Sequence, residues 1–358
     1  MNLPENGRLQ DPPARLEGLD LARCLALLGM VIVNFSIAMG ADAQRDPGLL
    51  AHIEHALQGR AAATFVTLAG LGLGLAARRA GHAATLAVTA KRSAFLLIAG
   101  LLNTLLFPAD ILHYYAVFFL LGALCLRLPG AALVALMLAV TIAAVTLILR
   151  FDYNAGWNWE TFDYPGFWTA TGFLRNLVFN GFHPVFPWFA FFLFGLVLSR
   201  LALDRRRVQW LLVAGGAAGL ALSGLLGEVL GGLATRDAPR LAPLLTTAPL
   251  PPMPLFVLAG CGAAALVTGS GLILARQRFR AALAPLMATG RQTLTLYIAH
   301  ILLGMGTLEA LGRLGGQRYV EVAVAVAVFC GAAVAYAVVW SRFFKRGPAE
   351  MLMRRLAG

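Results

Sequence analysis

The sequence is poor in charge and has no polar segment long enough to form a water-soluble domain. Of its 358 residues only 13% are charged, whereas 59% are hydrophobic. This composition excludes a soluble enzyme and a soluble binding module, because too few polar groups remain to cover a globular surface. The longest polar interruptions, roughly residues 150–182 and 231–253, are short enough to be loops of one domain.

Cysteine is also scarce, and its placement excludes two further classes of protein. The four cysteines, Cys24, Cys125, Cys261 and Cys330, all fall within apolar stretches. None has the spacing that is typical of metal ligands or of a disulfide-rich scaffold. We therefore expect packing cysteines, no disulfide framework and no metal.

What the sequence does contain is ten apolar stretches, most of them long enough to cross a bilayer at about 1.5 Å per residue. They are roughly residues 20–40, 60–77, 93–107, 109–126, 131–149, 184–200, 208–230, 254–275, 293–311 and 319–343. The first lacks a small-residue cleavage site, so we expect a retained helix rather than a signal peptide. The sequence predicts an all-α, polytopic transmembrane helical bundle of about 10 spans, with one domain over residues 1–358.

Basic residues are divided unequally between the two sides that these stretches define. Of the 29 lysines and arginines, 21 fall on the side that holds both chain ends, including Arg8 and Arg15, whereas Arg240 belongs to the other side. The positive-inside rule predicts that both termini are cytoplasmic, with short tails at 1–18 and 344–358. The net charge of +12 does not indicate nucleic-acid binding, because the basic residues lie in short clusters at helix ends.

A few ionisable residues border or enter the spans, where a charge costs about 2.5–3.5 kcal/mol at mid-membrane and suggests a function. Asp110 and His113 are three residues apart, so they share one face of a helix near its outer mouth. A carboxylate beside an imidazole orients the ring and raises its basicity, so this pair is the strongest acid/base candidate. His52 and His55 precede the second stretch on the same outer side.

His300 differs in predicted depth, because it follows Arg291 by nine residues and so lies about 13 Å into the membrane. Three roles are compatible with this position of His300: a structural histidine, a polar gate between the two faces, or a contact to an acyl group. Asn34 belongs to the outer half of the first helix, and His183 opens a stretch whose entry is broken by prolines.

The outer segment 151–168 is dense in aromatic residues, among them Trp157 and Trp159. An interfacial belt and a sugar-stacking platform both explain this composition. On the cytoplasmic side Arg23 follows Asp20 by three residues, so the two form either a salt bridge or part of a phosphate clamp.

Five segments, taken in order, resemble the membrane acyltransferases that include heparan-alpha-glucosaminide N-acetyltransferase and its bacterial relatives. They are RLEGLDLARCLALLGMVIVNF, FVTLAGLGLGLAARR, HPVFPWFAFFLFGLVLSR, GRQTLTLYIAH and KRGPAEMLMRRL. The resemblance extends over nearly the whole chain and rests on the order of segments that are individually mostly apolar. It implies a multi-pass protein of a bacterial cytoplasmic (inner) membrane.

The resemblance implies transfer of an acyl group, with acetyl as the expected group, from cytoplasmic acyl-CoA to an extracytoplasmic sugar or glycoconjugate. The family's catalytic base stands just before the second helix, a place that either His52 or His55 could hold. The catalytic candidates are His52, His55, Asp110 and His113. The candidates for binding acyl-CoA are Arg23, Arg78, Arg79, Arg291 and His300. The candidates for binding the acceptor are Asn34, His183, Trp157 and Trp159.

The expected partners are membrane lipid, acyl-CoA and the glycan or glycoconjugate acceptor, and no nucleic acid is expected. A homodimer is compatible with the sequence. The alternative function is a secondary transporter or a flippase of a small or lipid-linked substrate, since proline-broken spans with polar midplane residues are also typical of transporters. We favour the enzyme, because the sequence shows no convincing inverted repeat and transport needs no cluster of outer histidines. A noncatalytic sensor or assembly factor is the third candidate.

Overall fold

The structure, a computed structural model, describes residues 16–239, 241–276 and 278–358. Within these ranges the chain folds into helices joined by loops, and no β-strand forms, which confirms the predicted all-α class. Arg8, Arg15 and Arg240, to which the sequence assigned sides of the membrane, lie outside the described residues, as does most of the predicted tail 1–18.

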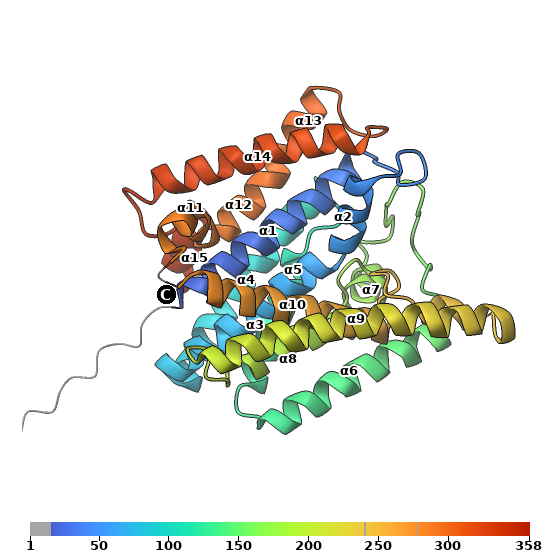
Figure 1. Cartoon of the computed structure of the whole chain (residues 1–358), viewed down its shortest axis with the longest axis horizontal. Helices are drawn as coiled ribbons and strands as arrows, with labels where there is room; N and C mark the ends of the chain where they lie inside the picture. The colour runs from blue at the N-terminus through green and yellow to red at the C-terminus, as the bar shows by residue number, and fades with distance from the viewer. Residues whose placement is uncertain (1–15, 240, 277) are drawn as a thin grey trace, which may run out of the picture.

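The elements follow one another as a series of long helices with short helical segments between them (Figure 1). In chain order they are α1 (Glu17–Ala38), α2 (Leu49–Leu57), α3 (Arg60–Ala80), α4 (His82–Thr104), α5 (Leu112–Cys125), α6 (Gly130–Arg150), α7 (Ala170–Arg175), the π-helix η1 (Asn176–Asn180), α8 (Val185–Leu198), α9 (Arg206–Asp237), the 3-10 helix η2 (Ala242–Leu244), α10 (Pro254–Leu274), α11 (Arg280–Gly290), α12 (Thr293–Ala299), the π-helix η3 (His300–Met305), α13 (Gly306–Ala310), α14 (Tyr319–Trp340) and α15 (Pro348–Ala357).

Within the described ranges, eight helical stretches are long and apolar enough to cross a membrane. A ninth is added if α7–η1 and α8, which meet at a bend of 53°, form one broken span. The apolar helix α5 has 14 residues and is shorter than a full span. The chain is thus a multi-pass membrane protein, whereas the count of ten spans and the cytoplasmic side of the termini stay predictions.

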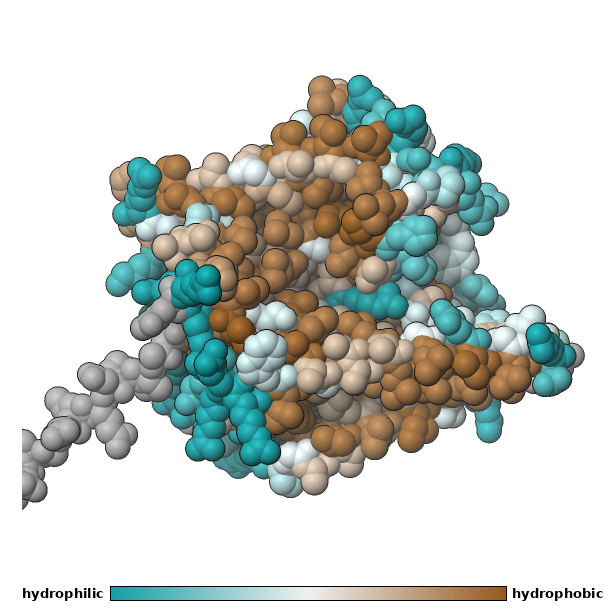
Figure 2. Space-filling model, viewed as in Figure 1, coloured by the Kyte–Doolittle hydropathy of each residue, from teal (hydrophilic) through white to brown (hydrophobic). Residues whose placement is uncertain are grey.

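The bundle has two ends, because its long helices run roughly alongside one another (Figure 1). We call one end the basic end; there α1 begins and α11 and α15 lie. Arg280 pairs with Glu17 at the start of α1, and Arg92 reaches the carbonyl oxygen of Gly358 after α15. The opposite end, the loop end, carries α2, α13 and the loop 151–169. Figure 2 shows hydrophobic side chains in a broad middle band and hydrophilic ones gathered at both ends, as expected for a protein that crosses a bilayer.

Close contact between α3 and α8 builds one wall of the interior. A side chain at Gly70 would collide with the backbone of Phe192, and one at Gly195 would collide with the backbone of Thr67. Small residues allow helix backbones in membranes to approach in this way. The contact fixes α8, with its buried aromatic side chains, against the centre of the bundle.

Candidate active site

The turn between α4 and α5 carries a carboxylate into the interior. Asp110 is fully buried and accepts hydrogen bonds from Nδ2 of Asn103 (3.1 Å) and from the hydroxyl of Tyr297 (3.1 Å). Its second oxygen accepts the backbone N–H of Leu112 (2.7 Å), one of the donors that has no partner within α5. The Tyr297 hydroxyl in turn accepts the N–H of Ile111 (3.1 Å). These bonds fix the carboxylate between α4, α5 and α12.

His113 lies one turn after Asp110 on α5 and is also fully buried. Its Nδ1 is 3.7 Å from Oδ2 of Asp110, a distance that allows an ion pair with a protonated ring but is too long for a hydrogen bond. Neither ring nitrogen has a hydrogen-bond partner among the described residues. Because a buried polar group without a partner costs about 1–3 kcal/mol and is rare, this ring is the strongest candidate for contact with a ligand.

Glycine and aromatic residues set the position of the His113 ring. Gly100 on α4 leaves room for the backbone of His113, where any side chain would collide. The ring packs on Tyr114 and Phe167, with centroids 3.9 and 5.7 Å away. Phe167 belongs to the loop 151–169, so this loop covers the histidine from the loop end. Tyr114 also contacts the ring of His183 at 5.7 Å.

Asp110, His113 and Tyr297 form one buried cluster. Tyr297 joins this cluster to His300, one turn further along the same helical segment. The Nδ1 of His300 bonds the carbonyl oxygen of Tyr297, and its Nε2 lies 3.0 Å from Nδ2 of Asn34. An amide nitrogen donates, so Nε2 accepts and Nδ1 carries the proton. His300 begins the π-helix η3, a local irregularity that is frequent at functional sites. Two residues that the sequence assigned to different substrates, Asn34 and His300, are therefore paired.

The structure brings together residues that the sequence placed at different depths. The sequence predicted Asp110 and His113 near the outer mouth and His300 near the midplane. Asp110 bonds Tyr297, which lies one turn from His300, because the turn between α4 and α5 packs into the interior with Phe107 and Asp110 both buried. The depth of each residue in the membrane stays a prediction.

A cavity of about 180 Å³ lies between Tyr297 and the basic end, and Asp110, His113 and His300 do not line it. Tyr297 and Leu112 lie in its wall on the side of the cluster, and Arg23 and Arg92 lie in its wall towards the basic end. Apolar side chains, such as Phe65, form much of the remainder. Binding pockets for whole ligands measure about 300–1,000 Å³, so this cavity fits the narrow end of an elongated ligand rather than all of it.

The two guanidinium groups of the cavity wall differ in their partners. Arg23 pairs with Asp20 at 2.8 Å, which is the salt bridge among the two alternatives that the spacing left open, and its side chain remains 29% exposed. Arg92 has a buried Nε with no hydrogen-bond partner among the described residues, and its Nη2 is 3.5 Å from the carbonyl oxygen of Gly358. Guanidinium groups in this position suit a phosphate or another anionic group at the mouth of the cavity.

Of the four arginines predicted to hold acyl-CoA, Arg23 lines this cavity and the others do not. Arg78 donates to the carbonyl oxygen of Ser199 (2.9 Å) and lines a different pocket of about 380 Å³. Arg79 is exposed at the end of α3, and Arg291 is half-buried after α11. Arg92 is the cavity residue that the predicted set omitted.

The outer histidines lie on the surface of the loop end. His52 and His55 are both exposed on α2, and Nδ1 of His52 bonds the carbonyl oxygen of Gly48 (2.7 Å). Between them Glu54 is buried and accepts two hydrogen bonds from Gln58. The structure thus separates these histidines from the hydrogen bonds around Asp110.

The predicted acceptor residues fall into two groups. Trp157 and Trp159 stack on each other at 4.4 Å in the outer loop, and the indole N–H of Trp157 donates to the carbonyl oxygen of Asn180 (2.6 Å). His183 is closer to the centre, with its ring 4.4 Å from that of Trp188 and its Nδ1 unpartnered among the described residues. Of the predicted acceptor residues in the loop end, His183 is therefore the one beside the cluster, through Tyr114.

Comparison with known proteins agrees with a transferase built on this fold. The family described as heparan-alpha-glucosaminide N-acetyltransferase, catalytic, matches residues 15–227, and a family described as protein of unknown function (DUF418) matches residues 195–358. The apolar helical bundle and the match to this catalytic family together define the class of protein as a membrane acetyltransferase. The first match covers more than half of the chain, so the chain belongs to the heparan-alpha-glucosaminide N-acetyltransferase-like family, which confirms the resemblance. No curated protein matches.

The cluster unites the two matched regions. Asp110 and His113 lie in the first matched region, whereas Tyr297 and His300 lie in the second. The hydrogen bond from Tyr297 to Asp110 joins them. Tyr297 was not among the predicted site residues, although its position three residues before His300 places both on one helix face.

Proposed function

We propose that the protein transfers an acyl group, acetyl by family, from acyl-CoA at the basic end to a hydroxyl or amine of a sugar or glycoconjugate at the loop end. The observation that carries the proposal is the buried His113, which has two unpartnered ring nitrogens and stands beside Asp110. In this proposal the basic end faces the cytoplasm of a bacterial inner membrane, as the positive-inside rule predicts.

The donor would occupy the cavity that ends at Tyr297. Its CoA phosphates would lie at the mouth beside Arg23 and Arg92, while the narrow pantetheine arm enters between the apolar walls. The unpartnered Nε of Arg92 supports this assignment, since a phosphate would supply the missing acceptor. Apolar walls also exclude water, which would otherwise hydrolyse a thioester held there.

The acceptor would approach from the loop end, beneath Phe167 and His183. Its hydroxyl or amine passes a proton to His113 while its oxygen or nitrogen forms the new bond to the thioester carbonyl carbon. The carbon–sulfur bond then breaks, and the imidazolium returns the proton to the leaving thiolate, which departs as the free thiol of CoA. Asp110, 3.7 Å from the ring, stabilises the imidazolium between these two steps.

The proposal assigns the base to His113 rather than to His52 or His55, the residues suggested by the family resemblance. Both surface histidines are exposed on α2, where solvent surrounds the ring. The buried ring has the fixed orientation and the neighbouring carboxylate that a general base requires.

The decisive assay follows thiol release by the purified protein from acetyl-CoA, with and without a series of glycan acceptors. We expect release that depends on one class of acceptor, with acetyl recovered on that acceptor in equal amount. Uptake of a labelled substrate into vesicles without any thiol release would instead support the transporter and contradict the proposal.

A further inference from the structure

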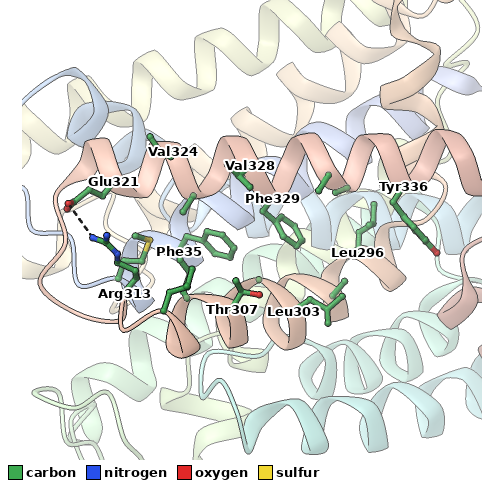
Figure 3. Close-up of a pocket in the computed structure, with 18 of the residues that line it drawn as sticks. Phe35, Leu296, Leu303, Thr307, Arg313, Glu321, Val324, Val328, Phe329 and Tyr336 are labelled. Carbon is green, nitrogen blue, oxygen red and sulfur yellow. Dashed lines mark ion pairs between the residues drawn. The ribbon is translucent and has the colours of Figure 1, made fainter.

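A second and larger hollow lies between α14 and the segment formed by α12, η3 and α13. It measures about 860 Å³ and is almost entirely apolar. Figure 3 shows Val328 and Phe329 of α14 facing Phe35 of α1 and Leu303 of η3 across it. We call this hollow the lateral groove.

The lateral groove opens sideways, towards the hydrocarbon of the membrane. Leu303 on one wall is 67% exposed, and Val324 and Val328 on the other are 60% and 68% exposed. All three lie on stretches long and apolar enough to span a bilayer. At this depth the surroundings are lipid chains, so the groove fills with hydrocarbon rather than with water.

The lateral groove is longer than the hydrocarbon region of one leaflet of a bilayer. From Glu321 to Tyr336, both of which line it, α14 advances fifteen residues, or about 22 Å. The hydrocarbon core of a bilayer is about 30 Å thick, so a chain that starts at the loop end would pass the midplane within the groove.

Two opposite charges stand at the loop end of the lateral groove. Arg313 and Glu321 both line it and form an ion pair of 3.8 Å, drawn in Figure 3. Their side chains are 54% and 42% exposed, so the pair is loose and open to solvent. A guanidinium next to a carboxylate complements a head group that joins a phosphate to a primary ammonium group.

We infer that the lateral groove binds a membrane phospholipid with a zwitterionic phosphate–ammonium head group, of the phosphatidylethanolamine type. An acyl chain lies between α14 and η3, the phosphate meets Arg313, and the ammonium meets Glu321. Leu296 and Ala299 in the groove wall flank Tyr297 and His300 on the same helical segment, so the lipid packs against the back of the catalytic cluster.

The test uses the full-length protein in vesicles and a phosphatidylethanolamine with a photoreactive acyl chain. We expect labelling to concentrate on peptides of η3 and α14, and to fall at least fivefold in Ala332→Trp, which fills the lateral groove. Ala327→Trp is the matched control, because Ala327 is exposed on the same helix but does not line the groove. Equal labelling of both variants, or uniform labelling of all lipid-facing helices, would overturn the inference.

Head-group recognition needs a separate comparison. Competition with unlabelled phosphatidylethanolamine should displace the probe more effectively than phosphatidylglycerol, and Arg313→Gln should weaken that preference by roughly threefold, as expected for an exposed charge contact. Arg45→Gln, at another exposed arginine of the loop end, should leave it unchanged. Displacement by phosphatidylglycerol at equal or lower concentration would refute the zwitterionic assignment. If Ala332→Trp fails to fold, Val328→Trp takes its place in the labelling experiment.

Discussion

The central cluster and the surface of α2 both present histidines near carboxylates, yet their surroundings differ. His113 and His300 are fully buried, and His113 has no partner for either nitrogen among the described residues. His52 and His55 are exposed, and His52 bonds its own helix. Burial with an unmet hydrogen-bonding capacity distinguishes a ring prepared for a ligand from one that solvent already satisfies. Substitutions in the two regions should therefore have effects of different size.

The largest effect among the residues around His113 is expected at Asp110. Asp110→Asn keeps the size of the side chain but removes the charge that stabilises the protonated ring. Turnover should fall by about 10² or more, the usual size of a lost acid/base contribution, while acetyl-CoA still binds. Asp42→Asn, at an exposed carboxylate of the loop end, is the control and should retain normal turnover. Near-normal turnover of Asp110→Asn would show that the buried cluster contributes no more to catalysis than the exposed residues of α2.

A smaller effect, on the Michaelis constant, is expected at the mouth of the cavity. Arg92→Gln should raise KM for acetyl-CoA about tenfold, since it removes a charged contact to phosphate, and the difference should shrink at high salt. Arg79→Gln should change KM little, because this exposed arginine does not line the cavity. Equal effects of both variants would indicate that general positive charge, not the cavity, attracts the donor.

A moderate loss of stability is expected where Asn34 of α1 contacts His300. Asn34→Ala removes the donor to Nε2 of His300 and leaves that nitrogen buried without a partner. We expect a loss of about 1–3 kcal/mol in the free energy of unfolding, measured by thermal or denaturant unfolding in detergent. Ser36→Ala, which loses only a bond within α1, should cost less. The reverse order would show that the Asn34–His300 pair does not support the cluster.

Much of the fold and part of the cluster could be predicted from the sequence. Apolar stretches between polar turns indicated the helices, and the three-residue spacing of Asp110 and His113 indicated the pair. The bond between Asn34 and His300 could not be predicted, because 266 residues separate them and periodicity reports only local faces. Tyr297 looked like one more residue of an apolar stretch, since nothing in the sequence reveals that the turn before α5 folds inward to meet it.

The smallest effect is expected on α2. His52→Gln and His55→Gln should each leave kcat within about twofold of the wild type, as is usual for exposed substitutions that remove no buried contact. Their unfolding temperatures should also stay unchanged. A large loss in one of them alone would identify it as the family's catalytic base and reverse the comparison.

One measurement tests the account most directly: acceptor-dependent thiol release by His113→Gln beside the double variant His52→Gln/His55→Gln, each matched for folded protein and for acetyl-CoA binding. We predict that His113→Gln loses turnover by about 10² or more, whereas the double variant stays within about twofold of the wild type. Normal turnover of His113→Gln together with an inactive double variant would contradict the assignment of the base to the buried cluster.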